Sequence, residues 1–150
     1  MSAETPQYQD SLGAHIGRTG KVLSAALVAR FRAAGYDYFT LDHWIVLLHL
    51  WHKDGQNQQY LGESAGRNKT TITRAIDSLE QRDFVVRIPD KDDRRNKLIY
   101  LTHGGRKLHE TLMPLAEEVV QEATMGIPTT DIDTCKSVLN YMFQRLREHI

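Results

Sequence analysis

The sequence is poor in cysteine and has no long apolar run, and each absence excludes a class of protein. Its 150 residues include one cysteine, so an internal disulfide framework is excluded and a reducing compartment is expected. The most apolar stretch, Trp44 to Trp51, is broken by His49 and is too short to cross a bilayer. The N-terminal residues lack the charged and then apolar pattern of a signal peptide. We therefore expect a soluble, cytoplasmic protein with no membrane partner.

The sequence also has no excess of charge of one sign. Nineteen Lys and Arg residues balance nineteen Asp and Glu residues, which by itself argues against a uniformly basic nucleic-acid binder. The basic residues are nevertheless concentrated. Positions 67–97 hold nine Lys/Arg against six Asp/Glu, a charge of +3 that leaves −3 for the remainder. A positive segment on an acidic body suits a protein that turns one face toward phosphate.

Signatures of catalysis and of metal binding are missing as well. The sequence shows no arrangement of nucleophile, base and orienting group and no phosphate-cradling glycine loop, so we expect neither an enzyme nor a cofactor. Among the seven histidines, His49 and His52 are three apart, and His43, His103 and His109 lie in neighbouring elements. With one cysteine and no tight ligand cluster, we expect no metal site, and a regulatory metal is the alternative.

Apolar periodicity predicts a mainly α fold with one small β-hairpin. Polar residues suited to N-caps precede several of the expected helices, and Pro114 is expected to kink or restart the fifth helix. The expected helices span about 11–32, 41–53, 58–65, 69–82, 103–124 and from 131 onward, with strands at 84–88 and 97–101. The expected N-caps are Thr40, Asn57, Asn68 and Thr102.

Three residues indicate that the third and fourth expected helices form a helix-turn-helix. Two helices that cross steeply need a small residue where they touch, and Gly62 provides it. The tight turn between them needs a left-handed residue, which Gly66 supplies. The angle between the helices must be filled by an apolar side chain on the second helix, here Ile72.

The second helix of this pair has an apolar stripe on one side and polar side chains on the other. In DNA-binding helix-turn-helix proteins, the N-terminal part of this helix enters the major groove. Short hydroxyls approach phosphates and base edges there, and Arg74 is favoured for base contact because a guanidinium can fork to guanine. A merely solvated face is the alternative. The candidate DNA-binding residues are Asn68, Lys69, Thr70, Thr71, Thr73 and Arg74.

The expected hairpin has a charged tip that suits a DNA-binding wing. Arginine is favoured where a narrow minor groove concentrates negative potential. Asp93, two residues before Arg95, is expected to hydrogen-bond the backbone and the guanidinium and so to hold Arg95 outward. The alternative is a solvated charged turn. The candidate wing residues are Asp93, Arg94, Arg95 and Lys97.

The stretch from Asn57 to Gly105 resembles the winged helix of the MarR family of transcriptional regulators. The Asp93-x-Arg95 pair and the Leu-Thr-x-x-Gly start of the fifth helix are the most specific parts. Three positions depart from the family pattern: Asp83 replaces a common Gly, Arg67 an apolar residue, and Gly62 an Ala. The matching motifs are Asn57-Gln-Gln-Tyr-Leu61, Asn68-Lys-Thr-Thr-Ile-Thr-Arg74, Leu79-Glu-Gln-Arg82, Pro89-Asp-Lys-Asp-Asp-Arg-Arg95 and Leu101-Thr-His-Gly-Gly105.

This resemblance implies a winged helix-turn-helix DNA-binding domain over residues 40–101 and dimerisation helices over residues 1–39 and 102–150. It also implies a homodimer on a pseudo-palindromic operator, usually acting as a repressor. A small effector, often aromatic or anionic, would release the double-stranded DNA. The alternative is a winged helix that binds a protein partner through the same surfaces and does not bind DNA.

Two further features have a functional and a structural interpretation. Tyr36, Trp44 and Trp51 are candidates to line an effector pocket, although core packing is the favoured explanation for these aromatic side chains. Cys135 is a possible redox sensor, but it lies on the apolar stripe of the last expected helix. We therefore expect a small buried side chain there.

Overall fold

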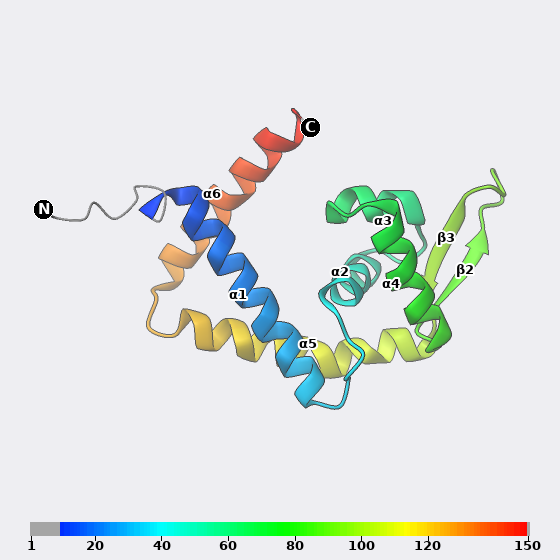
Figure 1. Ribbon diagram of the computed structural model, residues 1–150, viewed down its shortest axis with the longest axis horizontal. Helices are drawn as coiled ribbons and strands as arrows, with labels where there is room; N and C mark the ends of the chain where they lie inside the picture. Colours follow the sequence, from blue (N-terminus) through cyan, green and yellow to red (C-terminus); the bar gives the residue numbers. More distant parts are fainter. Residues whose placement is uncertain (1–9, 150) are drawn as a thin grey trace, which may run out of the picture. The chain divides into compact units, whose positions relative to one another are not determined.

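The computed structural model describes residues 10–149, and these residues form a mainly helical fold with one small antiparallel sheet (Figure 1). The chain divides after Ala116 into two compact units. The fold class agrees with the sequence prediction. In chain order the elements are α1 (Leu12–Ala33), α2 (Leu41–His52), β1 (Gln56–Asn57), α3 (Gln58–Ala65), α4 (Lys69–Gln81), β2 (Val85–Pro89), β3 (Lys97–Leu101), α5 (His103–Thr124) and α6 (Thr129–Arg147).

The helices of the first unit begin where side chains satisfy their first backbone N–H groups. The Asn68 carboxamide, for example, accepts a hydrogen bond from the Thr71 backbone N–H at 2.8 Å and fixes the start of α4. All four N-caps expected from the sequence are confirmed by such bonds. They are Thr40, Asn57, Asn68 and Thr102.

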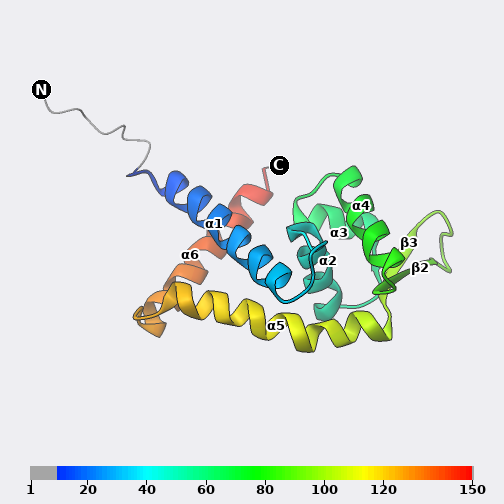
Figure 2. The same cartoon turned by 60° about the horizontal axis from the view of Figure 1, so that its bottom comes forward.

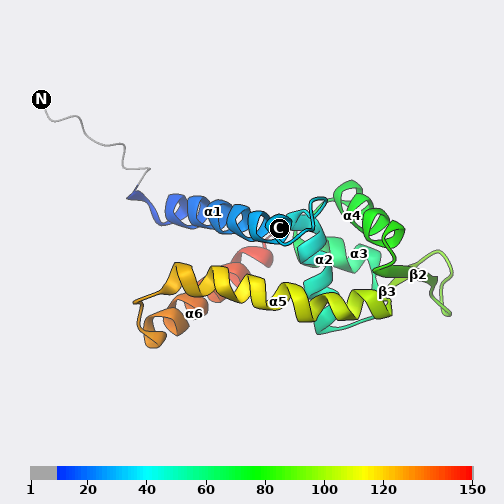
Figure 3. The ribbon, with the colours of Figure 1, turned by 90° about the horizontal axis from the view of Figure 1, so that it is seen from below.

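The sheet has the order β1-β3-β2, with both pairings antiparallel. The expected hairpin is β2–β3, in which Val85 faces Leu101. Its tip extends away from the helices of the winged helix (Figures 2 and 3). Strand β1 was not predicted, because two residues carry no periodicity. It is anchored by Gln56, whose buried amide donates to the His49 and Lys53 carbonyls at 2.6 Å each.

Helix α2 lies at the centre of the hydrophobic core of the first unit, as its nearly continuous apolar sequence predicts. Its Leu47 and Leu50 are fully buried. From α1, Phe31 is buried and its ring lies 4.8 Å from that of Trp44. Helix α4 contributes the whole predicted stripe, which consists of Ile72, Ala75, Ile76 and Leu79.

Helix α5 continues through Pro114 as one helix, so the chain does not restart there, and the alternative, a kink at this residue, stays a prediction. A proline removes one backbone hydrogen bond from a helix. Leu112 and Ala116, on either side of Pro114, are both buried, and this burial holds the flanking turns in helical conformation. Within residues 10–149, no helix is both long and apolar enough to span a membrane.

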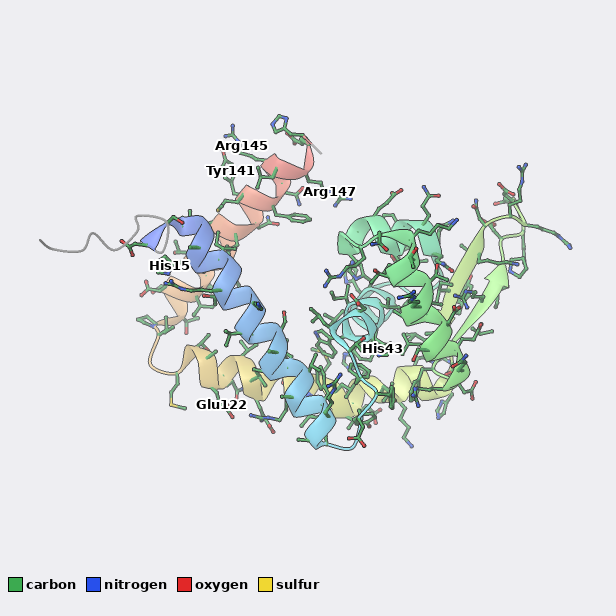
Figure 4. All side chains as sticks on the ribbon, in the orientation of Figure 1. His15, His43, Glu122, Tyr141, Arg145 and Arg147 are labelled. Carbon is green, nitrogen blue, oxygen red and sulfur yellow. The ribbon has the colours of Figure 1, made fainter. Side chains whose placement is uncertain are left out.

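The second unit, which begins at Glu117, contains the end of α5 and all of α6. Between Thr129 and Arg147, α6 has no buried residue. The prediction that Cys135 is buried is therefore wrong for the single chain, in which this cysteine is exposed. The apolar side chains of the same helix, including Leu139 and Phe143, are also exposed. On α6, Arg145 donates a hydrogen bond of 2.8 Å to the Tyr141 hydroxyl (both labelled in Figure 4).

Candidate nucleic-acid interface

Helices α3 and α4 form the predicted helix-turn-helix. Gly66 adopts the left-handed conformation, with φ 63° and ψ 31°, and ends α3. A Cβ on Gly62 would lie 3.5 Å from Cγ1 of Ile72 and 3.4 Å from the Arg67 carbonyl oxygen, so a small residue is needed where the two helices meet. The predicted roles of Gly62, Gly66 and Ile72 are confirmed. Arg67, which departs from the family pattern, places its Nε 2.9 Å from a carboxylate oxygen of Asp42 on α2.

Helix α4 presents part of its predicted polar face to solvent without internal partners. Lys69, Thr70 and Arg74 are exposed. Within residues 10–149, these three side chains have no hydrogen bond or ion pair. Because Thr70 and Arg74 are four residues apart, they lie on the same side of the helix. A long cation and a hydroxyl are thus free to bind a ligand on this face.

The other residues predicted on α4 have structural partners. The Asn68 side chain caps the helix through the Thr71 backbone N–H, and Thr71 itself is half-buried. The Thr73 hydroxyl accepts a hydrogen bond of 2.9 Å from the amide of Gln58 on α3. These three predicted residues therefore contribute first to the local structure of the helix-turn-helix.

The tip of the wing, the β2–β3 hairpin with its loop 90–96, is organised around Asp93. Its carboxylate accepts the Arg95 backbone N–H at 3.1 Å and lies 3.6 Å from the Arg95 Nε. Its backbone carbonyl accepts the Asn96 N–H at 2.9 Å. The predicted hydrogen bond from the Arg95 backbone to Asp93 is confirmed, whereas the contact with the guanidinium is an ion pair rather than the predicted hydrogen bond. The Arg95 side chain remains 94% exposed, and Arg94 and Lys97 are also exposed.

Cations from α4 and from the wing open on one hollow, here called the cationic groove, with a volume of about 600 Å³. Lys69 lines it from the first turn of α4, and Arg95 and Lys97 line it from the wing. The lining also includes Arg67, whose charge is paired with Asp42, and the carboxylate of Glu63. The complete lining is Asn57, Gln58, Gln59, Gly62, Glu63, Arg67, Lys69, Ile72, Arg95, Asn96 and Lys97.

The far end of α4 is tied to the start of α2. The Arg82 guanidinium lies 3.4 Å from the centre of the Tyr38 ring. Burial lowers the pKa of His43 (labelled in Figure 4), and the nearby charge of Arg82 lowers it further. The Asp42 carboxylate opposes this shift. Burial raises the pKa of Tyr38, and Arg82 opposes this shift. His43 is 4% exposed, and its Nδ1 accepts the Thr40 backbone N–H at 3.0 Å in a capping box.

Sequence reasoning missed Arg87, on the face of β2 that turns toward α4. Its guanidinium donates to carboxylates of Asp77 at 2.6 Å and Glu80 at 2.9 Å, and to the amide oxygen of Gln58 at 3.1 Å. A signal was present. Strand alternation places Arg87 on the same face as the buried Val85, where an arginine needs partners. The two acids, three residues apart on α4, supply them.

The three aromatic candidates for an effector pocket pack as core residues. The Trp44 and Trp51 rings lie 5.7 Å apart, and the Trp51 indole donates to the Gly105 carbonyl at 3.0 Å. Tyr36 instead packs against Phe39, with ring centres 6.3 Å apart. The structure therefore brings the two tryptophans together and connects Tyr36 to Trp44 through the rings of Phe39 and Phe31.

His49 and His109 take part in contacts within the fold. His49 Nδ1 lies 2.8 Å from the Ile45 carbonyl oxygen, and the His109 ring packs 5.1 Å from that of Trp51. In the described part of the chain, residues 10–149, no three His, Cys, Asp or Glu side chains are grouped so as to hold a metal ion.

Comparison with known proteins agrees with this geometry. Residues 39–97 match the model of the MarR family. The chain is 26% identical over 111 residues to the transcriptional regulator YybA of Bacillus subtilis, a match that covers 74% of this chain and 71% of YybA.

Solved structures share the fold over most of the chain. The structure of CouR from Rhodococcus jostii bound to p-coumaroyl-CoA has a TM-score of 0.79 and 25% identity, and the match covers 89% of this chain and 92% of CouR. A MarR-family regulator from Listeria monocytogenes, solved with a 26mer DNA, is similar in fold with a TM-score of 0.83 at 20% identity, over 93% of this chain and 91% of that one. Residues 39–97 match the MarR family of transcriptional regulators, and the fold is the winged helix of MarR-family structures, as the sequence predicts.

Proposed function

We propose that this protein is a DNA-binding transcriptional regulator, a cytoplasmic homodimer that represses transcription by binding a pseudo-palindromic operator. The observation that carries the proposal is the cationic groove, in which Lys69 of α4 and Arg95 and Lys97 of the wing line one hollow. Helix α4 would enter the major groove while the wing follows the adjacent minor groove. Two separate protein elements would thus contact neighbouring grooves of one duplex.

The exposed side chains of α4 and of the wing are proposed to make different kinds of DNA contact. Arg74, which is exposed and four residues from Thr70, is the proposed base contact because a guanidinium binds guanine through two hydrogen bonds. Lys69, Arg94 and Lys97 would bind phosphate, which fixes orientation without reading sequence. Arg95, held outward by Asp93, would enter the minor groove.

Dimerisation is proposed through residues 1–39 and 102–150, with residues 40–101 forming the DNA-binding domain. In the single chain, helix α1 exposes the side chains of Leu12 and Val22, and several apolar side chains of α6 are also exposed. A second copy of the chain would cover such apolar side chains. Sedimentation at micromolar concentration should then give a dimer, with half-sites about 34 Å apart. The exposed apolar residues of α6 are Val138, Leu139, Tyr141, Phe143 and Leu146.

Release by a small effector is part of the same proposal. CouR, which is 25% identical to this chain, was solved with p-coumaroyl-CoA, an aromatic and anionic molecule. A ligand of that character is therefore proposed here. The half-buried Trp51, packed beside Trp44, provides an intrinsic fluorescence signal with which to screen aromatic acids and their thioesters.

Binding to labelled duplexes over a range of salt concentrations tests DNA recognition. We expect affinity to fall steeply with salt, because bound phosphates release counterions. Arg95→Ala should weaken binding to every duplex, whereas Arg74→Ala should cost about 1–3 kcal/mol and act at one base step. A matched control is Lys107→Gln, since Lys107 is exposed on α5 outside the groove. Absence of DNA binding at low salt, with a stable protein complex in its place, would contradict the proposal.

A further inference from the structure

Arg87 joins three elements of the winged helix through one side chain. The guanidinium, 18% exposed, pairs with Asp77 and Glu80 on α4, and its Nε donates to Gln58 on α3. Its own backbone N–H, on β2, also donates to Glu80 Oε2 at 3.0 Å. These bonds come from the strand that begins the wing, so Arg87 connects the root of the wing to both helices of the helix-turn-helix.

We propose that Arg87 is a positioning residue of the DNA interface, which orients the Thr73 hydroxyl through Gln58 and compensates two carboxylates on α4. This inference rests on the proposed DNA binding, but it assigns no DNA contact to Arg87 itself. Its consequences concern sequence discrimination and the charge of the helix that reads the DNA.

The orientation of the Thr73 hydroxyl follows from a hydrogen-bond relay. Arginine is always protonated in proteins, so its Nε can only donate. The atom of Gln58 that lies 3.1 Å from Arg87 Nε must therefore be the amide oxygen. This fixes the amide nitrogen as the donor to Thr73 Oγ1 at 2.9 Å. The Thr73 proton is then free to be donated outward, to a phosphate oxygen or to an acceptor on a base edge.

The same guanidinium compensates charge on the helix that would face phosphate. Asp77 and Glu80 are 52% and 39% exposed on α4. Two uncompensated carboxylates there would repel a DNA backbone within the screening length of about 8 Å at physiological ionic strength. Arg87 binds one oxygen of each at 2.6 and 2.9 Å. The two carboxylates in turn hold the Arg87 guanidinium beside α4, which is where its positive charge must lie to compensate them.

The geometry also fixes the wing relative to α4. Arg87 stands opposite Ile99 in the β2–β3 register, and Ile99 is fully buried in the core. A side chain held at this strand position by α3 and α4 keeps the root of the hairpin at one distance from α4. Arg95 and Lys97 at the tip are carried by the same hairpin, so their placement in the cationic groove depends on this contact.

The test compares variants on two probes: a duplex that the wild-type protein selects from a random-sequence pool, and an unrelated duplex of equal length. Arg87→Lys keeps the charge but cannot reproduce the Nε relay, and Gln58→Met removes the relay without changing charge. Both should reduce the ratio of selected to unrelated affinity by about fivefold or more, the effect of losing one base-directed contact. Both should leave the dependence of affinity on salt unchanged.

Arg87→Met and the triple variant Arg87→Met, Asp77→Asn, Glu80→Gln test the compensation of charge. Arg87→Met should weaken binding to both duplexes, and the triple variant should restore binding to the unrelated duplex without restoring discrimination. Lys107→Gln is the control for loss of one positive charge, and circular dichroism establishes that each variant is folded. If Arg87→Met is unfolded, Arg87→Lys and Gln58→Met decide the question.

Two results would overturn the inference. One is a discrimination ratio equal to the wild-type value in both Arg87→Lys and Gln58→Met. The other concerns the slope of the logarithm of the binding constant against the logarithm of salt concentration. If the magnitude of this slope falls by about 0.9 in Arg87→Met, the variant has lost a phosphate contact, and Arg87 binds DNA directly. If the wild-type protein selects no duplex from the pool, the proposed function itself is contradicted. This result is obtained before any variant is made, so it cannot be confused with failure of the proposal for Arg87.

Discussion

Gly105 lies directly against the backbone carbonyl of Phe84: a Cβ at Gly105 would overlap the Phe84 oxygen and lie 3.0 Å from its carbonyl carbon. The neighbouring Thr102 hydroxyl donates to the Asp83 carbonyl at 2.5 Å and accepts the Gly105 N–H at 3.0 Å. The Leu-Thr-x-x-Gly motif therefore joins the start of α5 to the chain that leaves α4. This contact sets where the wing begins.

A methyl group at Gly105 should destabilise the protein. Gly105→Ala forces apart two backbone segments, and overpacking of this kind costs about 1–3 kcal/mol. Gly104→Ala is the matched control, because its Cβ would meet nothing closer than 3.4 Å. Alanine also favours a helix over glycine by up to about 1 kcal/mol. Urea unfolding followed by circular dichroism should therefore give opposite signs for the two variants; equal stabilities would contradict this account.

Asp83 should be replaceable by glycine with a gain in stability. It has a φ of 61° in the turn that ends α4, where the Phe84 N–H bonds the Leu79 carbonyl at 2.9 Å. Side chains in this conformation cost about 1–2 kcal/mol, less for Asp, and a carboxylate near a helix C-terminus is unfavourable. We expect Asp83→Gly to raise the free energy of unfolding by about 0.5–1 kcal/mol. Asp83→Ala, which keeps a Cβ, should not raise it.

The structure predicts a pH dependence of stability that comes from His43. Burial and Arg82 lower the pKa of His43 in the folded chain, so the unfolded chain binds a proton more readily. As the pH falls through the ordinary histidine value of about 6.5 toward the lowered value, unfolding takes up a proton and the free energy of unfolding decreases. Above about pH 6.5 this contribution to stability is complete.

His43→Gln isolates this effect, because glutamine at the same position can preserve the capping box with Thr40 without titrating. Stability is measured by urea unfolding at about pH 7.5 and about pH 5.5, on either side of the ordinary histidine value. The wild-type protein should lose more stability than His43→Gln between the two. His52→Gln, at an exposed histidine, should behave like the wild type. Identical pH dependence in the His43 variant and the wild type would rule out this source.

Local chemistry explains why much of this fold could be predicted from the sequence. Asn68 and Thr102 are followed by helices because their side chains satisfy backbone N–H groups within three residues. The helix-turn-helix follows from the size of Gly62 and the conformation of Gly66. The bracing of Arg95 by Asp93 needs only a separation of two residues. Each of these predictions concerns atoms that are close in the chain.

The predictions that failed, and the residues that were missed, depend on contacts between distant parts of the chain. Arg87 meets Gln58 across 29 positions, and no local pattern specifies that partner. Of the two outcomes predicted at Pro114, the restart does not occur, because buried neighbours hold the helix continuous. Cys135 lies on the apolar stripe of α6. An apolar stripe predicts that a helix face packs against another surface, but it does not indicate whether that surface belongs to the same chain. The sequence therefore indicates which side chains need partners more readily than where those partners are.

For Asp93 in the wing, net charge and the positioning of Arg95 predict opposite effects of a substitution on DNA affinity. Removing a negative charge near phosphate should tighten DNA binding if charge alone matters. Asp93, however, holds Arg95 through its backbone N–H at 3.1 Å and lies 3.6 Å from its Nε. Freeing a long side chain that must be ordered on binding costs about 0.5–1.5 kcal/mol. Asp93→Ala should therefore weaken DNA binding by about two- to tenfold, despite the gain of one positive charge.

Asp92 is the matched control for this prediction, because it is an exposed carboxylate beside Asp93 and, among residues 10–149, its side chain has no partner. Asp92→Ala should strengthen DNA binding, since it removes the same charge without releasing Arg95. The double variant Asp93→Ala, Arg95→Ala should bind no more weakly than Arg95→Ala alone, because a brace has no effect once the arginine is gone. Fluorescence anisotropy at one fixed salt concentration measures the wild type and the four variants. If Asp93→Ala tightens binding as much as Asp92→Ala does, then Asp93 acts through its charge alone and Arg95 needs no brace.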